Sequence, residues 1–540
     1  MSLRVVFRVD ASIHTGQGHV MRCLALAEQL RQRGALCRFI SAAHPGNLIS
    51  TVRNQGFAVE EIAPLDKSDW IGDARATAAA LGTEPTDWLV ADHYGLDYQW
   101  EALLKKHTTH LMVIDDLADR CHDCDLLLDQ NPGRLAEDYH RLINPHSQLL
   151  IGPEFALLRD EFAEQRKQPN PAGFDPVKKI LISLGGTDPN NVTTHVLSVL
   201  ESARIQSVAQ ITVILSSKAP WLEAVREQAR QSSLLIEVII NPEHMSEILS
   251  GIDLAIGAAG VSALERCCIG LPSLLIITAE NQRPGALALH ALGAAHCLGD
   301  LDEYENRLRH LLQEPPPAAY WETISARAKE LVDGEGCSRV AHIMSQIAAQ
   351  PLRRSFIAAA VSSSTPGQLR SVLSGDLPMI FAWRNHPDVR RFMRHSSTLN
   401  WHEHLAWFKR RQIAGNSPFI FEIDRVPLGF VQFDKTDSED CIEWGFYVAP
   451  DAPKGIGQRL GKAAISHIFK STSIHRIIGR VLPGNLRSQR FHERLGFHRM
   501  PHLARSESKS DAALIGFSLS RSDWSTANAG SHGEFYEYLR

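Results

Sequence analysis

Residues 4–19 of the chain, RVVFRVDASIHTGQGH, decide the architecture of its first part. The apolar run at 4–10 is typical of a buried strand, and the stretch 19–33 repeats apolar side chains with a helical period. Gly16 and Gly18 stand between the two, where residues without a side chain let the backbone approach a ligand closely. A strand, a glycine loop and a helix in this order are typical of a parallel β–α unit.

The same alternation of apolar runs and helical stretches continues to about residue 345. A polar, proline-bearing stretch at 165–176 divides it into two series, which predicts two consecutive Rossmann-like α/β domains at 1–155 and 156–345. Further strands are expected at 36–41, 87–92, 111–116 and 124–130 in the first domain, and at 178–186, 210–217, 234–240, 253–260 and 272–279 in the second.

Beyond a linker predicted at 346–362, the pattern of the chain changes. Apolar runs separated by short turns, one of them at 425–427, predict an antiparallel meander, and a helix at 456–470 follows it. We expect a smaller α+β domain at 363–522 and a tail without a clear element at 523–540. The strands expected in this domain are at 418–424, 428–435, 441–450, 475–482 and 513–520.

Composition limits the classes of function. A net charge of −5 with well-mixed charges gives no surface for a nucleic acid, and no apolar run is long enough to span a membrane. The nine cysteines are scattered and odd in number, which favours reduced thiols and a cytoplasmic location. Cys121 and Cys124 form a single CxxC without a second pair, so we expect no metal site.

Three glycine loops at the ends of expected strands suggest a ligand held in a crevice between the first two domains. His19 begins the first helix and would point into that crevice, although a capping or packing role fits it equally well. Glu265, one turn into a later helix, can accept hydrogen bonds from a ribose diol. The glycines expected to contact the nucleotide sugar are Gly16, Gly18, Gly185, Gly186 and Gly260.

Several separated motifs in residues 1–345 carry a family resemblance; they are GQGHVMRCLALAEQL, DHYGLD, VIDDLADR, LDQN, IGPEFALLRDEF, SLGGTDPNN and AENQ. The region resembles the UDP-2,4-diacetamido-2,4,6-trideoxy-β-L-altropyranose hydrolases, which resemble glycosyltransferases with two Rossmann-like domains (the GT-B type). The resemblance implies metal-free release of UDP with water as the acceptor. It also implies that His19 is catalytic and that Asn281 is its polar partner near the sugar, with Gln282 beside it.

Further polar residues end the expected strands of the first domain. His93 and Tyr94 are candidates for lining the sugar pocket, and Asp92 directly before them is a third. For Asp10, Asp92 and Asp115 a structural role as a cap or turn partner is favoured over a contact with substrate. A histidine can take a proton from water, and the sequence contains no motif for a paired-carboxylate glycosidase mechanism.

The loop at 453–460 suggests an acyl-CoA site in the last domain. Lys454 and the amides of the following loop, at the start of a helix, form a cradle for a pyrophosphate. The loop follows an antiparallel meander, which disfavours a dinucleotide fold. The residues expected in the cradle are Lys454, Gly455, Gly457 and Gln458.

Residues 355–520 resemble the GCN5-related N-acetyltransferases (GNAT), through this loop together with NLRS at 485–488 and FHERLGF at 491–497. The stretches FAWRNHPDVRRFM and WHEHLAWF are similar to the subgroup that acetylates amino-sugar nucleotides or protein N-termini. The resemblance implies acetyl-CoA as co-substrate. It also implies a β-bulge near Phe446–Val448 that exposes amides to the acetyl group, and a contact of Asn485 with the CoA arm.

Two positions depart from the GNAT pattern. Ala452 stands where an arginine or glutamine is usual, and His492 stands where a tyrosine often protonates the leaving thiolate. A histidine can protonate a thiolate, and it is equally compatible with a spectator role. Glu443 is a candidate base for the attacking amine, and a solvent-facing strand residue is the alternative.

The two resemblances together imply consecutive steps of pseudaminic acid biosynthesis, a sugar used on flagellin or surface polysaccharide. The acetyltransferase would act on UDP-4-amino-4,6-dideoxy-β-L-AltNAc, and the hydrolase would then remove UDP, which makes pathway neighbours possible partners. Alternatives are a glycosyltransferase or a related UDP-sugar hydrolase in the first part. For the last domain they are a protein acetyltransferase or a CoA-binding regulatory module.

Overall fold

The computed structural model describes residues 2–12, 16–66, 69–144, 147–168, 177–203, 207–349, 366–373, 376–393, 397–423, 426–450, 452–500 and 514–528. The turn expected at 425–427 and the linker expected at 346–362 lie partly outside these residues, as does the tail at 523–540. The chain divides into two compact units, Met1–Leu142 with His146–Gln350, and Pro351–Arg540 with Ile143–Pro145.

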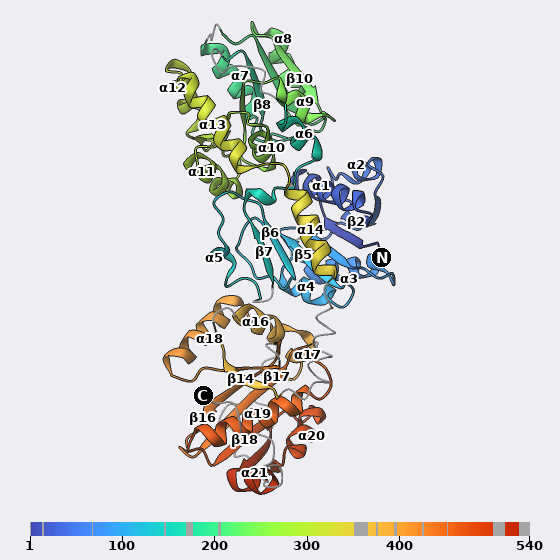
Figure 1. Ribbon diagram of the computed structural model, residues 1–540, viewed down its shortest axis with the longest axis vertical. Helices are drawn as coiled ribbons and strands as arrows, with labels where there is room; N and C mark the ends of the chain where they lie inside the picture. Colours follow the sequence, from blue (N-terminus) through green and yellow to red (C-terminus); the bar gives the residue numbers. More distant parts are fainter. Residues whose placement is uncertain are drawn as a thin grey trace. The chain divides into compact units, whose positions relative to one another are not determined.

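The first sheet is parallel and has the order β3-β2-β1-β4-β5-β6-β7 (Figure 1). Its apolar strands are buried because helices pack on the sheet, as expected for parallel strands. The strands are β1 Arg4–Val9, β2 Leu36–Ala42, β3 Ala58–Ile62, β4 Trp88–Asp92, β5 His110–Ile114, β6 Leu126–Asp129 and β7 Gln148–Ile151. The helices are α1 Gly18–Gln32, α2 Ile49–Asn54, α3 Trp70–Leu81, α4 Tyr98–Leu104, α5 Ala136–Tyr139, η1 Pro153–Phe155 and α6 Asp160–Arg166.

The second sheet, in the same compact unit, is also parallel, with the order β10-β9-β8-β11-β12-β13. Its strands are β8 Lys179–Ser183, β9 Gln210–Leu215, β10 Ile236–Ile240, β11 Leu254–Ala258, β12 Ser273–Ile276 and β13 His296–Gly299. Its helices are α7 Val192–Ala203, α8 Leu222–Gln231, α9 Met245–Ser250, α10 Val261–Ile269, η2 Glu280–Gln282, α11 Arg283–Ala291, α12 Tyr304–Gln313 and α13 Ala318–Leu331.

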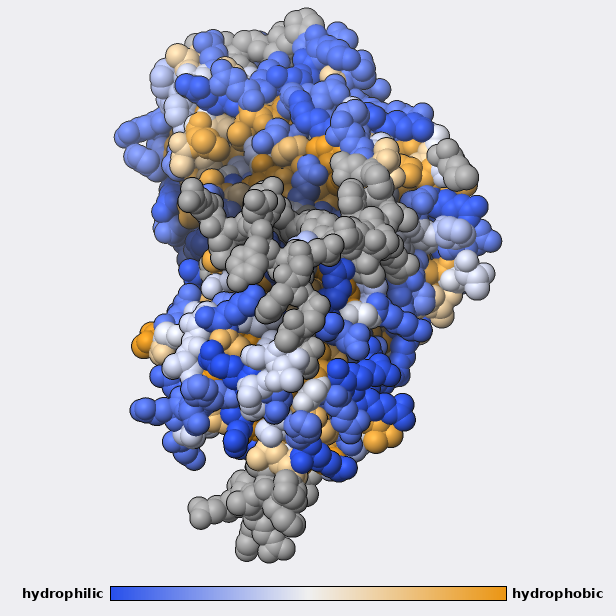
Figure 2. All heavy atoms as spheres, turned by 60° about the horizontal axis from the view of Figure 1, so that its bottom comes forward, coloured by the Kyte–Doolittle hydropathy of each residue, from blue (hydrophilic) through white to orange (hydrophobic). Residues whose placement is uncertain are grey.

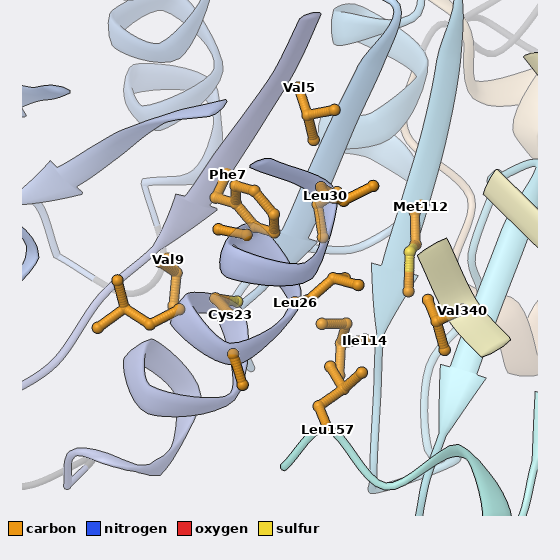
Figure 3. Close-up of a cluster of buried hydrophobic side chains, with 14 of the residues drawn as sticks. Val5, Phe7, Val9, Cys23, Leu26, Leu30, Met112, Ile114, Leu157 and Val340 are labelled. Atoms are coloured by element: carbon orange, nitrogen blue, oxygen red, sulfur yellow. The ribbon is translucent and has the colours of Figure 1, made fainter. Parts of the chain in front are cut away.

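The last helix of this unit, α14 (Gly336–Ala349), returns to the first sheet. Its residues Val340 and Met344 belong to the apolar cluster that also holds Met112 and Ile114 of β5. Figure 1 shows α14 against the first sheet, and Figure 3 shows Val340 beside Met112 and Ile114. Helix α14 therefore packs on the first sheet, although it lies more than three hundred residues after β1 along the chain.

The third sheet is mixed, with the order β14-β15-β16-β17-β18-β20-β19. Among the described strands of this sheet, β17 and β18 pair in parallel and the other neighbours are antiparallel. One apolar cluster includes α19 and a second includes residues of α16 and α18, so helices contribute to two cores of this sheet. The strands are β14 Gln368–Ser371, β15 Phe419–Ile423, β16 Val426–Lys435, β17 Cys441–Val448, β18 Arg476–Val481, β19 His498–Arg499 and β20 Ile515–Ser520. The helices are α16 Leu377–Asn385, α17 Pro387–Arg390, α18 Trp401–Ile413, α19 Ile456–Ser471, α20 Leu486–Arg494 and α21 Arg521–Asn528.

The predicted fold class, two Rossmann-like α/β sheets followed by a GNAT-type α+β domain, is confirmed. Hydrophilic residues cover much of the face shown in Figure 2, with apolar ones between them. Among the described residues, no helix combines the length and the apolar character that crossing a membrane requires. Cys121 and Cys124 are both buried free cysteines.

Candidate functional site

Three glycine-bearing loops at the carboxyl ends of strands converge in the first compact unit. A Cβ atom added to Gly18 would stand 3.6 Å from Cγ2 of Val261, the first residue of α10. A Cβ atom added to Gly186, in the loop after β8, would stand 3.6 Å from Oε1 of Gln17. The loops after β1, β8 and β11 therefore meet at one place, the position where ligands bind between two Rossmann-like sheets.

Glycines of these loops face open space. A Cβ atom added to Gly16, Gly185 or Gly260 would meet no atom within 4 Å. Gly16 and Gly185 have φ angles of +76° and +91°, which an L side chain rarely adopts. Gly260 is the N-cap of α10, so this helix directs its first amides toward the open side. The backbone at these loops is accessible to a phosphate-bearing ligand.

His19 is anchored at the start of α1 by a buried carboxylate. Its Nδ1 atom lies 2.6 Å from Oδ1 of Asp92, whose side chain is 0% exposed, whereas the His19 side chain keeps 10% exposure. Burial alone favours the neutral form of Asp92, but the Arg22 guanidinium and the His19 ring outweigh it and hold the pKa of Asp92 well below its usual range.

The charge of Asp92 decides which ring nitrogen of His19 carries the proton. Because the carboxylate is ionised, the proton of this short hydrogen bond is on Nδ1. In the neutral ring, Nε2 is then the nitrogen that carries the lone pair. No hydrogen bond to Nε2 is found among the residues that the structure describes. The arrangement is that of an oriented general base.

Arg22 belongs to this cluster as well. It lies within the motif GQGHVMRCLALAEQL, but the sequence assigns it no role. Its Nε atom lies 2.6 Å from Oδ2 of Asp92 and its Nη2 atom lies 2.6 Å from Oδ1, while Nη1 lies 3.2 Å from Oδ2 of Asp116. The one sequence signal for it is its spacing from His19, three residues along a helix, which places both side chains on the same face.

Tyr94 and Asn281 meet beside His19. The Tyr94 hydroxyl group donates to Oδ2 of Asp116 at 3.1 Å, and Nδ2 of Asn281 donates to the same hydroxyl at 3.2 Å. The rings of Tyr94 and His19 are edge-to-face, with centroids 4.6 Å apart. The structure thus brings together three predicted residues that come from the start of α1, the loop after β4 and the η2 turn.

Of the two roles considered for Asp92, the structure contradicts the contact with the sugar and agrees with the favoured structural role. Its fully buried carboxylate is occupied by His19 and Arg22, so it positions His19. His93 is also engaged, since Nδ1 accepts from the Gly95 amide at 3.0 Å and Nε2 lies 3.4 Å from Oδ2 of Asp10. Both side chains hold the loop after β4 in place.

The strand-end aspartates have structural contacts. Asp10 pairs with Arg8, at 2.6 Å between Nη1 and Oδ1, and accepts from the Ala42 amide at 2.7 Å. Asp115 accepts from the Tyr139 hydroxyl group and from the Ala118 amide, each at 2.9 Å. These contacts fit the structural role that the sequence favours for both residues.

Two further residues predicted to contact the substrate, Gln282 and Glu265, lie in helices that connect strands of the second sheet. Oε1 of Gln282 accepts from the backbone amide and the hydroxyl group of Thr278, at 3.2 and 3.1 Å, which stabilises the turn at η2. Glu265 lies in α10, where burial raises the pKa of its carboxyl group. Glu265 lies near the N-terminus of α10. Its contact with the ribose stays a prediction.

The third sheet opens between its two parallel strands. β17 pairs with β18 only from Cys441 to Glu443, while its pairing with β16 continues to Val448. The register of β16 and β17 is unbroken over Phe446–Val448, so the predicted β-bulge there is wrong. The amides of β17 on the side of β18 become accessible because the strands separate after Glu443.

The side chains of Phe446 and Val448 pack inward. The Phe446 ring lies with its centroid 4.8 Å from that of Phe491, and Val448 belongs to the residues packed on the same apolar cluster. Both side chains are only partly buried, so the backbone and part of each side chain remain available to contact a cofactor.

The loop before α19 has the geometry of an anion cradle. Gly455 is the N-cap of this 16-residue helix, with a φ angle of +100° and no atom within 4 Å of an added Cβ. Lys454 is exposed beside it, and the Gln458 amide donates to the Gly455 carbonyl group at 3.1 Å. Among the described residues, no backbone acceptor is found for the amides of Lys454, Gly455 and Gly457. These groups suit the pyrophosphate of CoA.

Asn485 is the N-cap of α20. Its Oδ1 atom accepts from the Ser488 amide at 3.0 Å, which satisfies one of the free amides at the start of that helix. One lone pair of Oδ1 is therefore used within the protein. The Nδ2 group and the second lone pair of Oδ1 remain for a contact with the CoA arm.

His492 does not have the surroundings of a general acid. It is 2% exposed, its Nδ1 atom donates to the Ser488 carbonyl group at 2.8 Å, and its Nε2 atom accepts from Nε1 of Trp444 at 3.2 Å. Burial lowers the pKa of His492 to about 4, against the opposing effect of the Ser488 bond. Of the two roles that the sequence leaves open, these surroundings favour the spectator and disfavour the general acid: the neutral ring is a core residue that joins α20 to β17.

Glu443 lies where β17 and β18 separate. Its Oε2 atom is 3.4 Å from Nε of Arg480, and its cross-strand neighbour on β16 is Asp434. The side chain is 17% exposed, so it is neither fully buried nor simply solvent-facing. This place at the mouth of the opening is compatible with the predicted role of a base.

One family model and two relatives each match one of the two parts of the chain. Residues 368–498 match the family model described as "Acetyltransferase (GNAT) domain". The UDP-2,4-diacetamido-2,4,6-trideoxy-beta-L-altropyranose hydrolase of Campylobacter jejuni is 27% identical over 248 residues, which cover 46% of this chain and 82% of that protein. The acetyltransferase PseH of Campylobacter jejuni is 28% identical over 125 residues, covering 23% of this chain and 78% of that protein.

One relative spans both parts. An uncharacterized protein of Methanocaldococcus jannaschii is 22% identical over 511 residues, which cover 92% of this chain and 96% of that protein. The chain therefore joins a region similar to a nucleotide-sugar hydrolase to a GNAT acetyltransferase domain. Proteins with the GNAT domain bind acetyl-CoA.

Proposed function

We propose that the chain carries out two reactions on UDP-linked amino sugars. One is hydrolysis of UDP-2,4-diacetamido-2,4,6-trideoxy-β-L-altropyranose to UDP and the free sugar. The other is N4-acetylation of UDP-4-amino-4,6-dideoxy-β-L-AltNAc with acetyl-CoA. The observation that carries the proposal is the oriented pair of Asp92 and His19 beside the converging glycine loops. The name of the Campylobacter jejuni hydrolase supports the choice of the hydrolysed substrate. The similarity to an acetyltransferase of Campylobacter jejuni supports the second reaction.

In the hydrolysis, His19 acts as the general base. A water oxygen attacks C1 of the sugar as the bond from C1 to the UDP oxygen breaks, and the water proton passes to Nε2 of His19. The bond electrons leave with UDP, whose charge is stabilised by backbone amides of the loops. Asn281 and Tyr94 are proposed to contact the sugar. The proposed nucleotide contacts are Gly16, Gly18, Gly185, Gly186, Gly260 and Glu265, in domains bounded at 1–155 and 156–345.

In the acetyl transfer, the domain at 363–522 holds the CoA moiety and orients the acceptor amine. Acetyl-CoA supplies an acetyl thioester when bound. The loop residues Lys454, Gly455 and Gly457 are proposed to bind its pyrophosphate, with Asn485 along the pantetheine arm. The amine nitrogen would attack the thioester carbonyl carbon, the C–S bond would break, and CoA would leave as a thiolate that takes a proton from water. Glu443 is proposed to accept the proton that the attacking amine loses, directly or through water.

The two proposed reactions are consecutive. Acetylation of the 4-amino group makes the second acetamido group of the sugar that the hydrolase releases. Carrying both sites on one chain raises the local concentration of the acetylated intermediate near the second site. The order of the reactions is opposite to the order of the domains along the chain.

An NMR time course with UDP-4-amino-4,6-dideoxy-β-L-AltNAc, with and without acetyl-CoA, tests the proposal. We expect N4-acetylation only with acetyl-CoA, followed by release of UDP and free sugar without any added acceptor. UDP release from the unacetylated amine at the same rate, or no acetylation, would contradict it. Release that depends on an added sugar acceptor would identify the alternative, a glycosyltransferase.

A further inference from the structure

Arg22 is buried beside the proposed base without reaching the ligand side of the loops. Its side chain is 3% exposed and makes three contacts with carboxylate oxygens, two on Asp92 and one on Asp116. A guanidinium group buried to this extent needs such partners, because an unpaired buried charge is strongly unfavourable. Arg22 therefore acts on His19 through Asp92, which makes it a positioning residue.

Asp92 is shared between a histidine and an arginine. Its Oδ1 atom lies 2.6 Å from Nδ1 of His19 and 2.6 Å from Nη2 of Arg22, so two donors converge on one oxygen. As a result, Nη2 of Arg22 lies only 3.1 Å from Nδ1 of His19. A permanent positive charge thus stands next to the imidazole ring, and the negative charge of Asp92 is already compensated.

This compensation distinguishes the cluster from a carboxylate–histidine pair alone. An uncompensated carboxylate favours the doubly protonated, positively charged ring, which has no lone pair to accept a proton. An arginine on the same carboxylate opposes that effect and leaves the hydrogen bond to Nδ1 in place. We infer that Arg22 keeps His19 neutral and protonated on Nδ1, so that Nε2 is ready to take a proton from water. One part of the inference rests on the proposed hydrolase function, namely that this water is the one that attacks the sugar.

The other described groups around His19 do not replace Arg22. Asp116 faces Arg22 from the end of β5 and receives the Tyr94 hydroxyl group from the loop after β4. Burial, with the nearby Asp116 carboxylate, raises the pKa of Tyr94, so this group stays a neutral phenol. Cys23 lies 3.6 Å from Oδ2 of Asp92, and burial raises the pKa of its thiol. Arg22 is thus the one cation among these neighbours within the described part of the chain.

An NMR titration of His19 in the ligand-free, full-length protein tests the inference. Histidine is labelled with carbon-13 at Cε1, and the His19 signal is assigned by its absence in His19→Gln. The variants are Arg22→Gln, Arg22→Lys and Asp92→Asn, each checked for folding by circular dichroism. Arg120→Gln is the matched control, because Arg120 is a mostly buried arginine, with 15% of its side chain exposed, that pairs with Asp115 at 2.8 Å without contacting His19.

We expect Arg22→Gln to raise the titration midpoint of His19 by about one pH unit or more, since Asp92 then acts on the ring uncompensated. Arg22→Lys should keep the midpoint close to that of the wild type, Asp92→Asn should lower it, and Arg120→Gln should leave it in place. A midpoint in Arg22→Gln within about 0.3 unit of the wild type would overturn the inference. If Arg22→Gln does not fold, Asp92→Asn decides, and an unchanged or raised midpoint would overturn it.

A second readout connects the cluster to the proposed reaction. The acid limb of the pH profile of kcat/KM for UDP release should move in Arg22→Gln in the same direction as the His19 titration. The titration needs no substrate, so it stands or fails independently of the hydrolase proposal. A merely structural Arg22 would lower the amount of folded enzyme or kcat without moving either midpoint.

Discussion

His19 on α1 and His492 on α20 differ in the property that proton transfer requires. His19 uses one ring nitrogen to bind an ionised carboxylate and keeps the other without a partner among the described residues. His492 uses both ring nitrogens inside an apolar core, where burial lowers its pKa to about 4. The comparison teaches that the surroundings of a histidine, rather than its place in a motif, indicate whether it can exchange protons.

The largest expected effect separates the two histidines directly. We expect His19→Gln to lower kcat for release of UDP from the diacetamido substrate by about 10³-fold, the usual contribution of a general base. His492→Gln should change kcat for acetyl transfer by less than about 10-fold, because a buried neutral ring does not protonate a thiolate. Initial rates for each reaction, measured on both variants, check this pair. A loss of about 10³-fold in His492→Gln would restore it as the general acid.

The next prediction concerns the stability of the acetyltransferase domain. The pKa of His492 is about 4 in the folded protein and 6.5 ordinarily, so between these values the unfolded chain binds a proton that the folded chain does not. The free energy of unfolding is therefore fully kept above pH 6.5 and falls as the pH approaches 4, by at most about 3 kcal/mol for this group. Burial lowers the pKa of His404 to about 4 as well, which adds a loss of the same sign.

Hydrogen exchange of the full chain, followed by mass spectrometry at pH 6.5 and at pH 4.5, checks this. Peptides of α19 and α20 should lose protection at the lower pH after correction for the intrinsic exchange rate. The loss should be smaller in His492→Gln, which has no proton to gain. An equal loss in the variant would assign the pH dependence to other groups.

A smaller effect is expected from the packing around His492. A Cβ atom added to Gly479 of β18 would stand 2.3 Å from Nε2 of His492 and 2.9 Å from Nε1 of Trp444. Gly479→Ala should therefore lower the free energy of unfolding of this domain by about 1–3 kcal/mol, the usual cost of overpacking. Urea denaturation gives the value. Gly484→Ala is the control, since an added Cβ there meets no atom within 4 Å, and an equal loss in both variants would contradict the packing argument.

The smallest effect concerns the cofactor loop. Lys454 is exposed, and an exposed charge contributes little binding energy, so Lys454→Ala should raise KM for acetyl-CoA by about 3- to 10-fold with kcat nearly unchanged. Lys462→Ala, also exposed but within α19, is the matched control. Steady-state kinetics with varied acetyl-CoA check this, and equal KM values for the two variants would argue against a pyrophosphate at the loop.

The sequence predicted the parts of the fold that depend on local pattern. Buried central strands such as β1, β4 and β11 are continuous apolar runs and were expected at the right places. The edge strand β3 was not expected, because two of the five residues in its sequence AVEEI are glutamates. The return of α14 to the first sheet could not be predicted either, since it depends on contacts between residues that are far apart along the chain.

The candidate site shows the same limit. The glycine loops and His19 stand out in the sequence because strand, loop and helix follow one another directly. Arg22 does not, because its partner Asp92 is 70 residues away and only the fold brings them together. The burial of His492 also depends on the partner strand β17, which supplies Trp444 from 48 residues away.

The most direct test of two separate active sites on one chain is a phosphorus-31 NMR time course on wild type and His19→Gln. Both are supplied with UDP-4-amino-4,6-dideoxy-β-L-AltNAc and acetyl-CoA. We predict that the wild type releases UDP, whereas His19→Gln accumulates the N4-acetylated UDP-sugar with its pyrophosphate intact. Release of UDP by His19→Gln at the rate of the wild type, or failure of both proteins to acetylate the amine, would contradict the account.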